Sequence, residues 1–192
     1  MQLKDVTIGF AITGSFCTFE NILDIIKRLI EEGADLIPIF SYATDEMNTR
    51  YGNAEDFKNK IIEITGKQPV VDINGAEPIG PKAILDVLIV APCTGNTIAK
   101  LANAITDTPV TMACKAHLRN NRPVILSIST NDGLGANAKN IGLLLNMKNI
   151  FMVPFGQDNP TLKPNSLLSK NELILKTIIE ALKGKQIQPL LI

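Results

Sequence analysis

Hydroxyl groups, amides and glycines are concentrated in five short segments of this chain, each directly after a run of apolar residues. The segments span residues 13–15, 41–44, 92–97, 127–135 and 154–165. Hydroxyls and the free backbone N–H groups at helix N-termini are the donors that a phosphate group needs. Ordinary turns and helix caps use the same residue types, but three hydroxyl-bearing loops that meet at one place favour a phosphorylated ligand.

The glycine pattern indicates which phosphorylated ligand fits. The turn that contains Gly9 and Gly14 lacks the three-glycine fingerprint of dinucleotide-binding proteins. The second apolar run ends in Phe40 and Ser41, where a dinucleotide site has an acid for the ribose 2′-hydroxyl. NAD bound within this chain is therefore disfavoured. A mononucleotide such as FMN needs one phosphate cradle and a flat slot for its ring, and it fits these loops better.

Few residues are suited to acid–base, nucleophilic or metal chemistry. His117 is the single histidine, so a metal site is not expected, and its apolar neighbours at helical spacing favour a partly buried structural role. Cys93 follows a predicted strand, where it is able to touch a ligand, but no basic neighbour in sequence favours its thiolate. Asp132 is the acid that we single out in the loops.

The elements that position these loops alternate between strands and helices. Apolar runs predict strands at residues 6–12, 36–40, 70–73, 87–91, 124–128 and 150–153. Periodicity and capping signals predict helices at residues 22–30, 53–66, 98–105, 109–118, 136–147 and 166–183. This alternation predicts an α/β fold, a three-layer, doubly wound parallel sheet of about six strands that is Rossmann- or flavodoxin-like. In such a sheet the ligand lies at the carboxyl ends of the strands.

Composition supports a single domain over residues 1–192. Hydrophobic residues make up 45% of the chain and charged residues 20%, and 19 acidic side chains balance 19 basic ones. A neutral chain is a poor partner for nucleic acid, and the longest apolar run is too short to span a bilayer. The three cysteines fit neither a disulfide framework nor a zinc site, and the first residues do not read as a secretion signal. We therefore expect a cytoplasmic protein, with residues 154–165 as a lid or plain connector and 166–183 as a closing helix.

Two loop motifs, Thr13-Gly14-Ser15 and residues 91–100, resemble the homo-oligomeric flavin-containing cysteine decarboxylase superfamily. The resemblance implies FMN bound at the boundary between protomers of a homotrimer or a multiple of it. It puts Gly14, Ser15 and Ser41 at the FMN phosphate, and residues 92–97 along the ribityl chain and ring. Asn96 is then the candidate catalytic residue near the substrate. The full set of expected cofactor-binding residues is Thr13, Gly14, Ser15, Ser41, Pro92, Cys93, Thr94, Asn96, Thr97, Ser127 and Ser129.

Longer motifs at residues 79–82, 115–119, 129–135 and 154–160 are similar to one branch of this superfamily. The branch implies an aromatising two-electron oxidation, of dihydrodipicolinate to dipicolinate, in the mother-cell cytosol of a spore-forming bacterium. It also implies a partner, a second subunit that is dehydrogenase-like and carries NAD(P). The two carboxylates of such a substrate need donors, for which we expect Lys100, Gly133, Gly135, Lys139 and Lys163.

Other members of the superfamily provide the alternative functions. The decarboxylases carry a histidine at a place that falls near Pro78 here, and the prenyltransferases carry an arginine where this chain has Ser129. An FMN-dependent decarboxylase and a flavin prenyltransferase are therefore disfavoured alternatives. A third alternative is a non-catalytic subunit that stabilises its dehydrogenase partner, because a redox-active flavin and a vestigial one need the same cradle.

Overall fold

The computed structural model describes residues 1–192 and contains one central sheet. Its body is five parallel strands, in the order β2 (Asp35–Phe40), β1 (Thr7–Ile12), β3 (Val87–Cys93), β4 (Val124–Thr130) and β5 (Ile150–Met152). Two further strands, β6 (Phe155–Asn159) and β7 (Lys163–Ser169), form an antiparallel hairpin that pairs with the end of β4 through β7. The predicted α/β fold with a doubly wound parallel sheet is confirmed, and the hairpin raises the strand number to seven.

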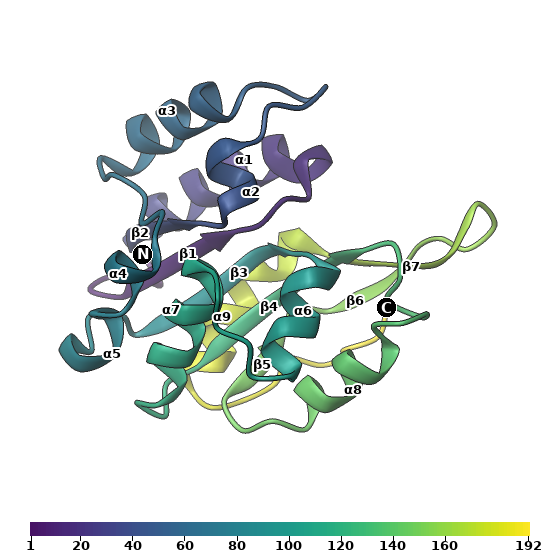
Figure 1. The fold of residues 1–192 in the computed structure, drawn as a ribbon. Helices are drawn as coiled ribbons and strands as arrows, with labels where there is room; N and C mark the ends of the chain where they lie inside the picture. The colour runs from purple at the N-terminus through teal and green to yellow at the C-terminus, as the bar shows by residue number, and fades with distance from the viewer.

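Helices cover both faces of this sheet (Figure 1). One face carries α1 (Phe19–Glu31), α3 (Ala54–Thr65) and α9 (Ile174–Leu182). The other carries α4 (Ile73–Ala76), α5 (Ile79–Lys82), α6 (Gly95–Ala102), α7 (Pro109–Leu118) and α8 (Ala138–Leu145). Side chains alternate along β1, so that Ile8, Phe10 and Ile12 enter the first core and Ala11 enters the second. The result is three layers around one sheet.

Local sequence signals account for several helix ends. Asn53 precedes α3, and Gly66 ends it in the left-handed conformation, at φ 69°, where a residue without a side chain avoids a steric cost. α7 begins with Pro109, and the hydroxyls of Thr108 and Thr111 form a capping box at its start. The helices predicted at residues 53–66 and 109–118 are therefore confirmed. None of the helices is long and apolar enough to cross a bilayer.

One predicted strand is absent. Residues 70–73 contribute a single bridge, in which Val70 lies beside Ile39 of β2. The extended segment ends there because the Asp72 carboxylate accepts a hydrogen bond from the backbone of Gly75 and so caps α4. Two valines between turn residues do not distinguish a strand from one bridge.

The prediction for residues 154–183 is wrong in its element types. Residues 154–165 contain β6 and the start of β7, and the helix expected at 166–183 begins only at Ile174, after a 3-10 turn at Asn171–Leu173. β7 continues to Ser169 because Leu167 and Leu168 pair with the end of β4, which lies far away in the chain. Whether the hairpin closes over a ligand as a lid stays a prediction.

Candidate functional site

The carboxyl ends of β1 and β3 meet where the strand order reverses. From β1 the chain passes to β2 on one side, and β3 then lies on the other side of β1. The Thr13 hydroxyl joins the two ends, because it donates to the carbonyl of Pro92 at 2.7 Å and accepts from the backbone N–H of Thr94 at 3.1 Å. A switch point of this kind is where open α/β sheets bind their ligands.

The end of β4 reaches the same edge and closes one side of a cavity. Ser129 of β4 lies with its Oγ 2.8 Å from the Oγ of Ser15 in the turn after β1. Beyond this contact is a cavity of about 450 Å³, here named the sheet-edge cavity. Its lining residues are Gly14, Ser15, Cys17, Thr18, Thr94, Gly95, Ser129, Thr130, Asn131, Asp158, Lys163, Ser166, Leu167 and Leu168.

A second cavity, of about 390 Å³, adjoins the first and is here named the β2-side cavity. Gly14 and Thr94 line both cavities, so the two adjoin at these residues. The other lining residues of the β2-side cavity are Thr13, Ser41, Tyr42, Ala43, Asn96, Thr97, Lys100 and Thr108. This lining contains no carboxylate, and Lys100 is its one cation. Both volumes fall in the usual range for small-molecule sites, about 300–1,000 Å³.

Where the two cavities adjoin, the start of α6 provides backbone N–H groups that have no hydrogen-bond partner. Thr94 is the N-cap residue of α6, but its side chain makes no capping hydrogen bond, so the backbone N–H groups of the first turn stay free for a ligand. A Cβ on Gly95 would lie 2.5–2.8 Å from atoms of Thr130, Asn137 and Asp132. Glycine therefore lets the loop after β4 pack directly against this helix start. Free N–H groups, hydroxyls and the acid-free lining fit the phosphate of an FMN.

Ten of the residues predicted from the sequence line the two cavities. They are Thr13, Gly14, Ser15, Ser41, Thr94, Asn96, Thr97, Lys100, Ser129 and Lys163. Ser41 is buried, and its hydroxyl accepts a hydrogen bond from the backbone of Thr44 at 3.2 Å, which caps the short helix α2 (Tyr42–Glu46). The β1, β2, β3 and β4 loops therefore converge on one place, as the sheet topology requires.

The remaining six predicted residues line neither cavity. The Cys93 side chain is buried in the core under the sheet, and burial raises the pKa of its thiol far above the usual range. Ser127 donates to Oδ1 of Asn171 at 2.7 Å, Gly133 packs against Leu167, and Lys139 lies exposed on α8. The carbonyl of Pro92 accepts the hydrogen bond from Thr13. Gly135 is exposed in the loop after β4.

The hairpin brings in side chains that the sequence did not single out. Asp158 and Ser166 line the sheet-edge cavity together with Asn131. Asp132, the acid singled out in the loops, does not line this cavity and is held by the Thr130 hydroxyl and the Asn137 amide, the latter at 2.8 Å. Because the register of β6 and β7 decides which hairpin side chains face the cavity, no local sequence signal identifies Asp158.

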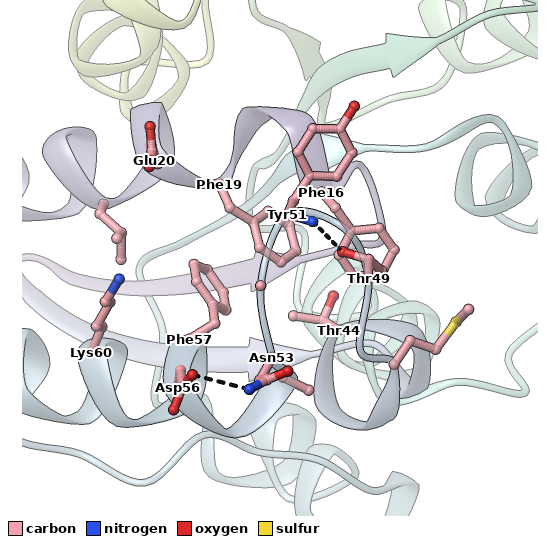
Figure 2. A pocket seen from close by; sticks show the side chains of 14 residues that line it. Phe16, Phe19, Glu20, Thr44, Thr49, Tyr51, Asn53, Asp56, Phe57 and Lys60 are labelled. Carbon is pink, nitrogen blue, oxygen red and sulfur yellow. Dashed lines mark hydrogen bonds between the residues drawn. The ribbon is translucent and has the colours of Figure 1, made fainter.

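A third cavity lies between α1, α3 and the loop before α3, and Figure 2 shows its aromatic lining. The rings of Phe19 and Phe57 stack at 4.1 Å between centroids, and Phe16 lies 5.2 Å from Phe19. Its volume is about 130 Å³, and a cavity of about 150 Å³ holds a single benzene ring. This cavity is much smaller than the two at the sheet edge, which are therefore the better candidates for a flavin.

His117 lies on α7, away from both the sheet-edge cavity and the β2-side cavity. Its side chain is buried, and burial, aided by the charge of Arg122, lowers its pKa to about 4. The imidazole is thus neutral at physiological pH. No group of three or more His, Cys, Asp and Glu side chains is arranged to hold a metal ion.

Two known proteins resemble this chain over its whole length, and a third shares its fold over most of it. The B subunit of dipicolinate synthase from Bacillus subtilis (strain 168) is 49% identical over 191 residues, which cover 100% of this chain and 96% of that protein. The crystal structure of the same subunit from Bacillus halodurans is 46% identical, with a TM-score of 0.92 over 100% of this chain and 98% of that one. DmrB of Burkholderia xenovorans, solved in complex with FMN, is 20% identical with a TM-score of 0.61 over 77% of this chain and 87% of that one, and shares the fold.

The Flavoprotein family matches residues 1–180. That range contains every loop that lines the two sheet-edge cavities, from the turn after β1 to the β6–β7 hairpin. The chain belongs to the Flavoprotein family.

Proposed function

We propose that this chain is the flavin-binding subunit of a dipicolinate synthase, which oxidises dihydrodipicolinate to dipicolinate during sporulation. The observation that carries the proposal is the convergence of the β1, β2, β3 and β4 loops on two adjoining cavities at the switch point. The similarity to the B subunit of dipicolinate synthase over the full chain supports the same reaction.

FMN is the proposed cofactor. Its phosphate would be held by the turn Thr13-Gly14-Ser15, by Ser41 and by the first turn of α6, where hydroxyls and free N–H groups meet. Asn96 is exposed in the β2-side cavity and is the proposed side chain between cofactor and substrate. When bound, the flavin would provide a two-electron acceptor.

The proposed substrate is a small dicarboxylate, and the cavities offer one cation each. Lys163 lines the sheet-edge cavity and Lys100 the β2-side cavity, each paired with an acid at 2.7–2.8 Å. The substrate carboxylates would compete with Asp107 for Lys100 and with Asp158 for Lys163. The exposed Lys139 lies outside both cavities, so its proposed role requires a neighbouring protomer.

The proposed assembly has two kinds of subunit. The A subunit of dipicolinate synthase, which is dehydrogenase-like, would carry NAD(P), because the turn after β1 of this chain lacks a dinucleotide fingerprint. This chain would form a homotrimer or a multiple of it, with the flavin between protomers, in the mother-cell cytosol. Aromatisation favours the reaction, so the protein needs mainly to orient the substrate and to remove a proton.

One experiment tests the redox proposal against a purely stabilising role. The chain is reconstituted with FMN and mixed with its dehydrogenase-like partner, dihydrodipicolinate and NAD(P), and flavin absorbance and pyridine-dicarboxylate absorbance are followed together. We expect the flavin to bleach and recover as dipicolinate forms. If flavin-free protein supports the full rate and the flavin is never reduced, the chain has only a stabilising role and the redox proposal is wrong.

A further inference from the structure

The oxidation proposed above removes a proton as well as a hydride from the substrate, so a group at the site must accept that proton. The side chains around the sheet-edge cavity are mostly hydroxyls, amides and aliphatic groups. Only three of them ionise, namely Cys17, Asp158 and Lys163. The β2-side cavity has no carboxylate, histidine or cysteine in its lining.

Two of the three ionisable side chains are poor proton acceptors. The hydrogen bond to the carboxylate of Asp158 raises the pKa of Lys163, so Lys163 keeps its proton. Cys17 is exposed, and its sulfur contacts the hydroxyl of Ser15 at 3.9 Å on the turn after β1, so no hydrogen bond from a cation fixes it in place as Lys163 fixes Asp158. Of the three ionisable side chains, the carboxylate of Asp158 is therefore the best candidate to accept the proton.

The geometry of Asp158 is that of an anchored carboxylate with one free oxygen. Its Oδ2 accepts a hydrogen bond from Nζ of Lys163 at 2.8 Å, and the Oγ of Ser166 lies 3.5 Å from the same oxygen. Its Oδ1 makes no hydrogen bond within the chain, and the side chain is 29% exposed on the cavity wall. Ser166 is buried, and its hydroxyl lies 3.3 Å from the carbonyl of Thr130, so it links the hairpin to the end of β4 beside the carboxylate.

Asp132, the other acid close to the site, is already occupied. The Thr130 hydroxyl donates to its Oδ1, and the Asn137 amide donates to its Oδ2 at 2.8 Å. It does not line the sheet-edge cavity. Asp132 therefore orders the loop after β4, and Asp158 is the carboxylate that faces the open volume.

We propose that Asp158 is the catalytic base of the oxidation, an inference that rests on the proposed function. One C–H bond of the dihydropyridine ring leaves with its electron pair as a hydride to the two-electron acceptor, an oxidised flavin or nicotinamide. The neighbouring C–H bond gives its electron pair to the new ring double bond and its proton to Oδ1 of Asp158. Lys163, on the same cavity wall, is the cation that then pairs with a substrate carboxylate.

The substitution Asp158→Asn tests this role, because the amide keeps the size of the side chain and cannot accept the proton. We expect kcat to fall about 100-fold or more, in the range for loss of a general base, with FMN retention and thermal midpoint unchanged. The fall in kcat/KM at acid pH that a base produces in the wild type should disappear. Asp158→Glu keeps the carboxylate, so it should recover part of the rate together with the acid limb of the pH profile.

Glu180→Gln is the matched control. The Lys183–Glu180 pair has the same length, 2.8 Å, and nearly the same exposure of its two side chains, 55% and 29%, as the 56% and 29% of the Lys163–Asp158 pair. Glu180 lies on α9, away from both cavities. E180Q should leave the rate and the pH profile unchanged.

A second readout does not depend on turnover. Binding of dipicolinate brings two carboxylates close to Asp158, so the wild type should take up a proton, measured by calorimetry in two buffers of different ionisation enthalpy. D158N should take up none. If wild type and partner form no pyridine dicarboxylate, the proposed function is overturned. If they form it, and D158N matches the wild type in rate and proton uptake, only the assignment of Asp158 is overturned.

Discussion

At the scale of single residues, the site is a set of hydroxyls that hydrogen-bond to backbone groups and to one another across the sheet edge. Thr13 bridges β1 and β3, and Ser15 bridges β1 and β4 at 2.8 Å. A hydroxyl pair both donates and accepts, so it exchanges its internal partner for a phosphate oxygen without leaving a buried group unpaired. The same residues therefore stabilise the sheet edge and provide donors for the proposed cofactor.

The substitution Ser15→Asp should abolish FMN binding. A carboxylate about 4 Å from a phosphate repels it by about 4 kcal/mol at the edge of a protein, so we expect affinity to fall by at least 100-fold. The asparagine of Ser15→Asn has the size of aspartate without its charge, so this variant should lower the FMN affinity by only about tenfold. Flavin fluorescence during titration measures both. Equal losses in S15D and S15N would mean that Ser15 does not face the phosphate.

The buried His117 should make stability depend on pH. Its pKa is about 4 in the folded protein, against an ordinary value of 6.5. The unfolded chain therefore binds a proton below pH 6.5 that the folded protein binds only near pH 4. The free energy of unfolding should fall by about 3 kcal/mol between these values and then level off.

The variant His117→Leu isolates this contribution, because it removes the titrating imidazole and fills the buried position with an apolar side chain of similar size. Urea unfolding at pH 7 and pH 4.5 gives the difference for each protein. We expect the wild type to lose more stability than H117L on acidification. Parallel losses in the two proteins would show that other groups, such as paired carboxylates, account for the pH dependence.

At the scale of elements, the β6–β7 hairpin is the part that completes the sheet-edge cavity. Its strands are antiparallel in an otherwise parallel sheet, and Figure 1 shows its turn projecting beyond the body of the molecule. Leu162 near the turn is 79% exposed, whereas Leu167 is buried against the loop after β4. The base of the hairpin is thus packed against the sheet, whereas its tip extends into solvent.

Lys163→Ala tests whether the hairpin binds substrate as the proposed lid. Lys163 is half exposed and pairs with Asp158 at 2.8 Å, so its loss leaves the β-ladder intact and removes one cation from the cavity. We expect KM for the dicarboxylate to rise about tenfold, the loss of one charged hydrogen bond, with flavin retention unchanged. Lys183→Ala is the control. A loss of flavin at constant KM would make Lys163 a structural residue.

At the scale of the whole molecule, several large apolar side chains between residues 105 and 147 are exposed, two of them on α8. They are Ile105, Leu134, Leu143, Leu145 and Met147, each between 41% and 53% exposed. Apolar surface of this kind is typical of a contact with another chain. The sheet-edge cavity and the β2-side cavity are both open to solvent. This openness fits a site that a neighbouring protomer completes.

We predict that the chain assembles and that assembly and flavin binding are coupled. Light scattering at micromolar concentration should give three times the mass of one chain, or a multiple of it. Dilution below the concentration of assembly should release the flavin, seen as a rise in free FMN fluorescence. A monomer that retains FMN on dilution would contradict the prediction of a shared site.

Local sequence signals were sufficient to predict the parallel part of the fold and the loops of the site. Apolar runs such as that of β3 identify buried strands, and the capping residues around α3 and α7 identify helix ends, because both signals act within a few residues. Once strands and helices alternate, the carboxyl ends of the parallel strands must share one edge. The positions of Thr13, Ser15, Thr94 and Ser129 followed from that rule.

The C-terminal part, and with it the position of Asp158, depends on contacts between distant segments. β7 is a strand because Leu167 and Leu168 pair with Thr130 and Ser129 across the sheet, and no residue near them in sequence indicates that pairing. The register of the hairpin then turns Asp158 and Lys163 toward the cavity, whereas Asp132 is held by its neighbours. Pairing between distant strands depends on side-chain packing across the sheet. Only the tertiary structure therefore decides that Asp158 faces the sheet-edge cavity.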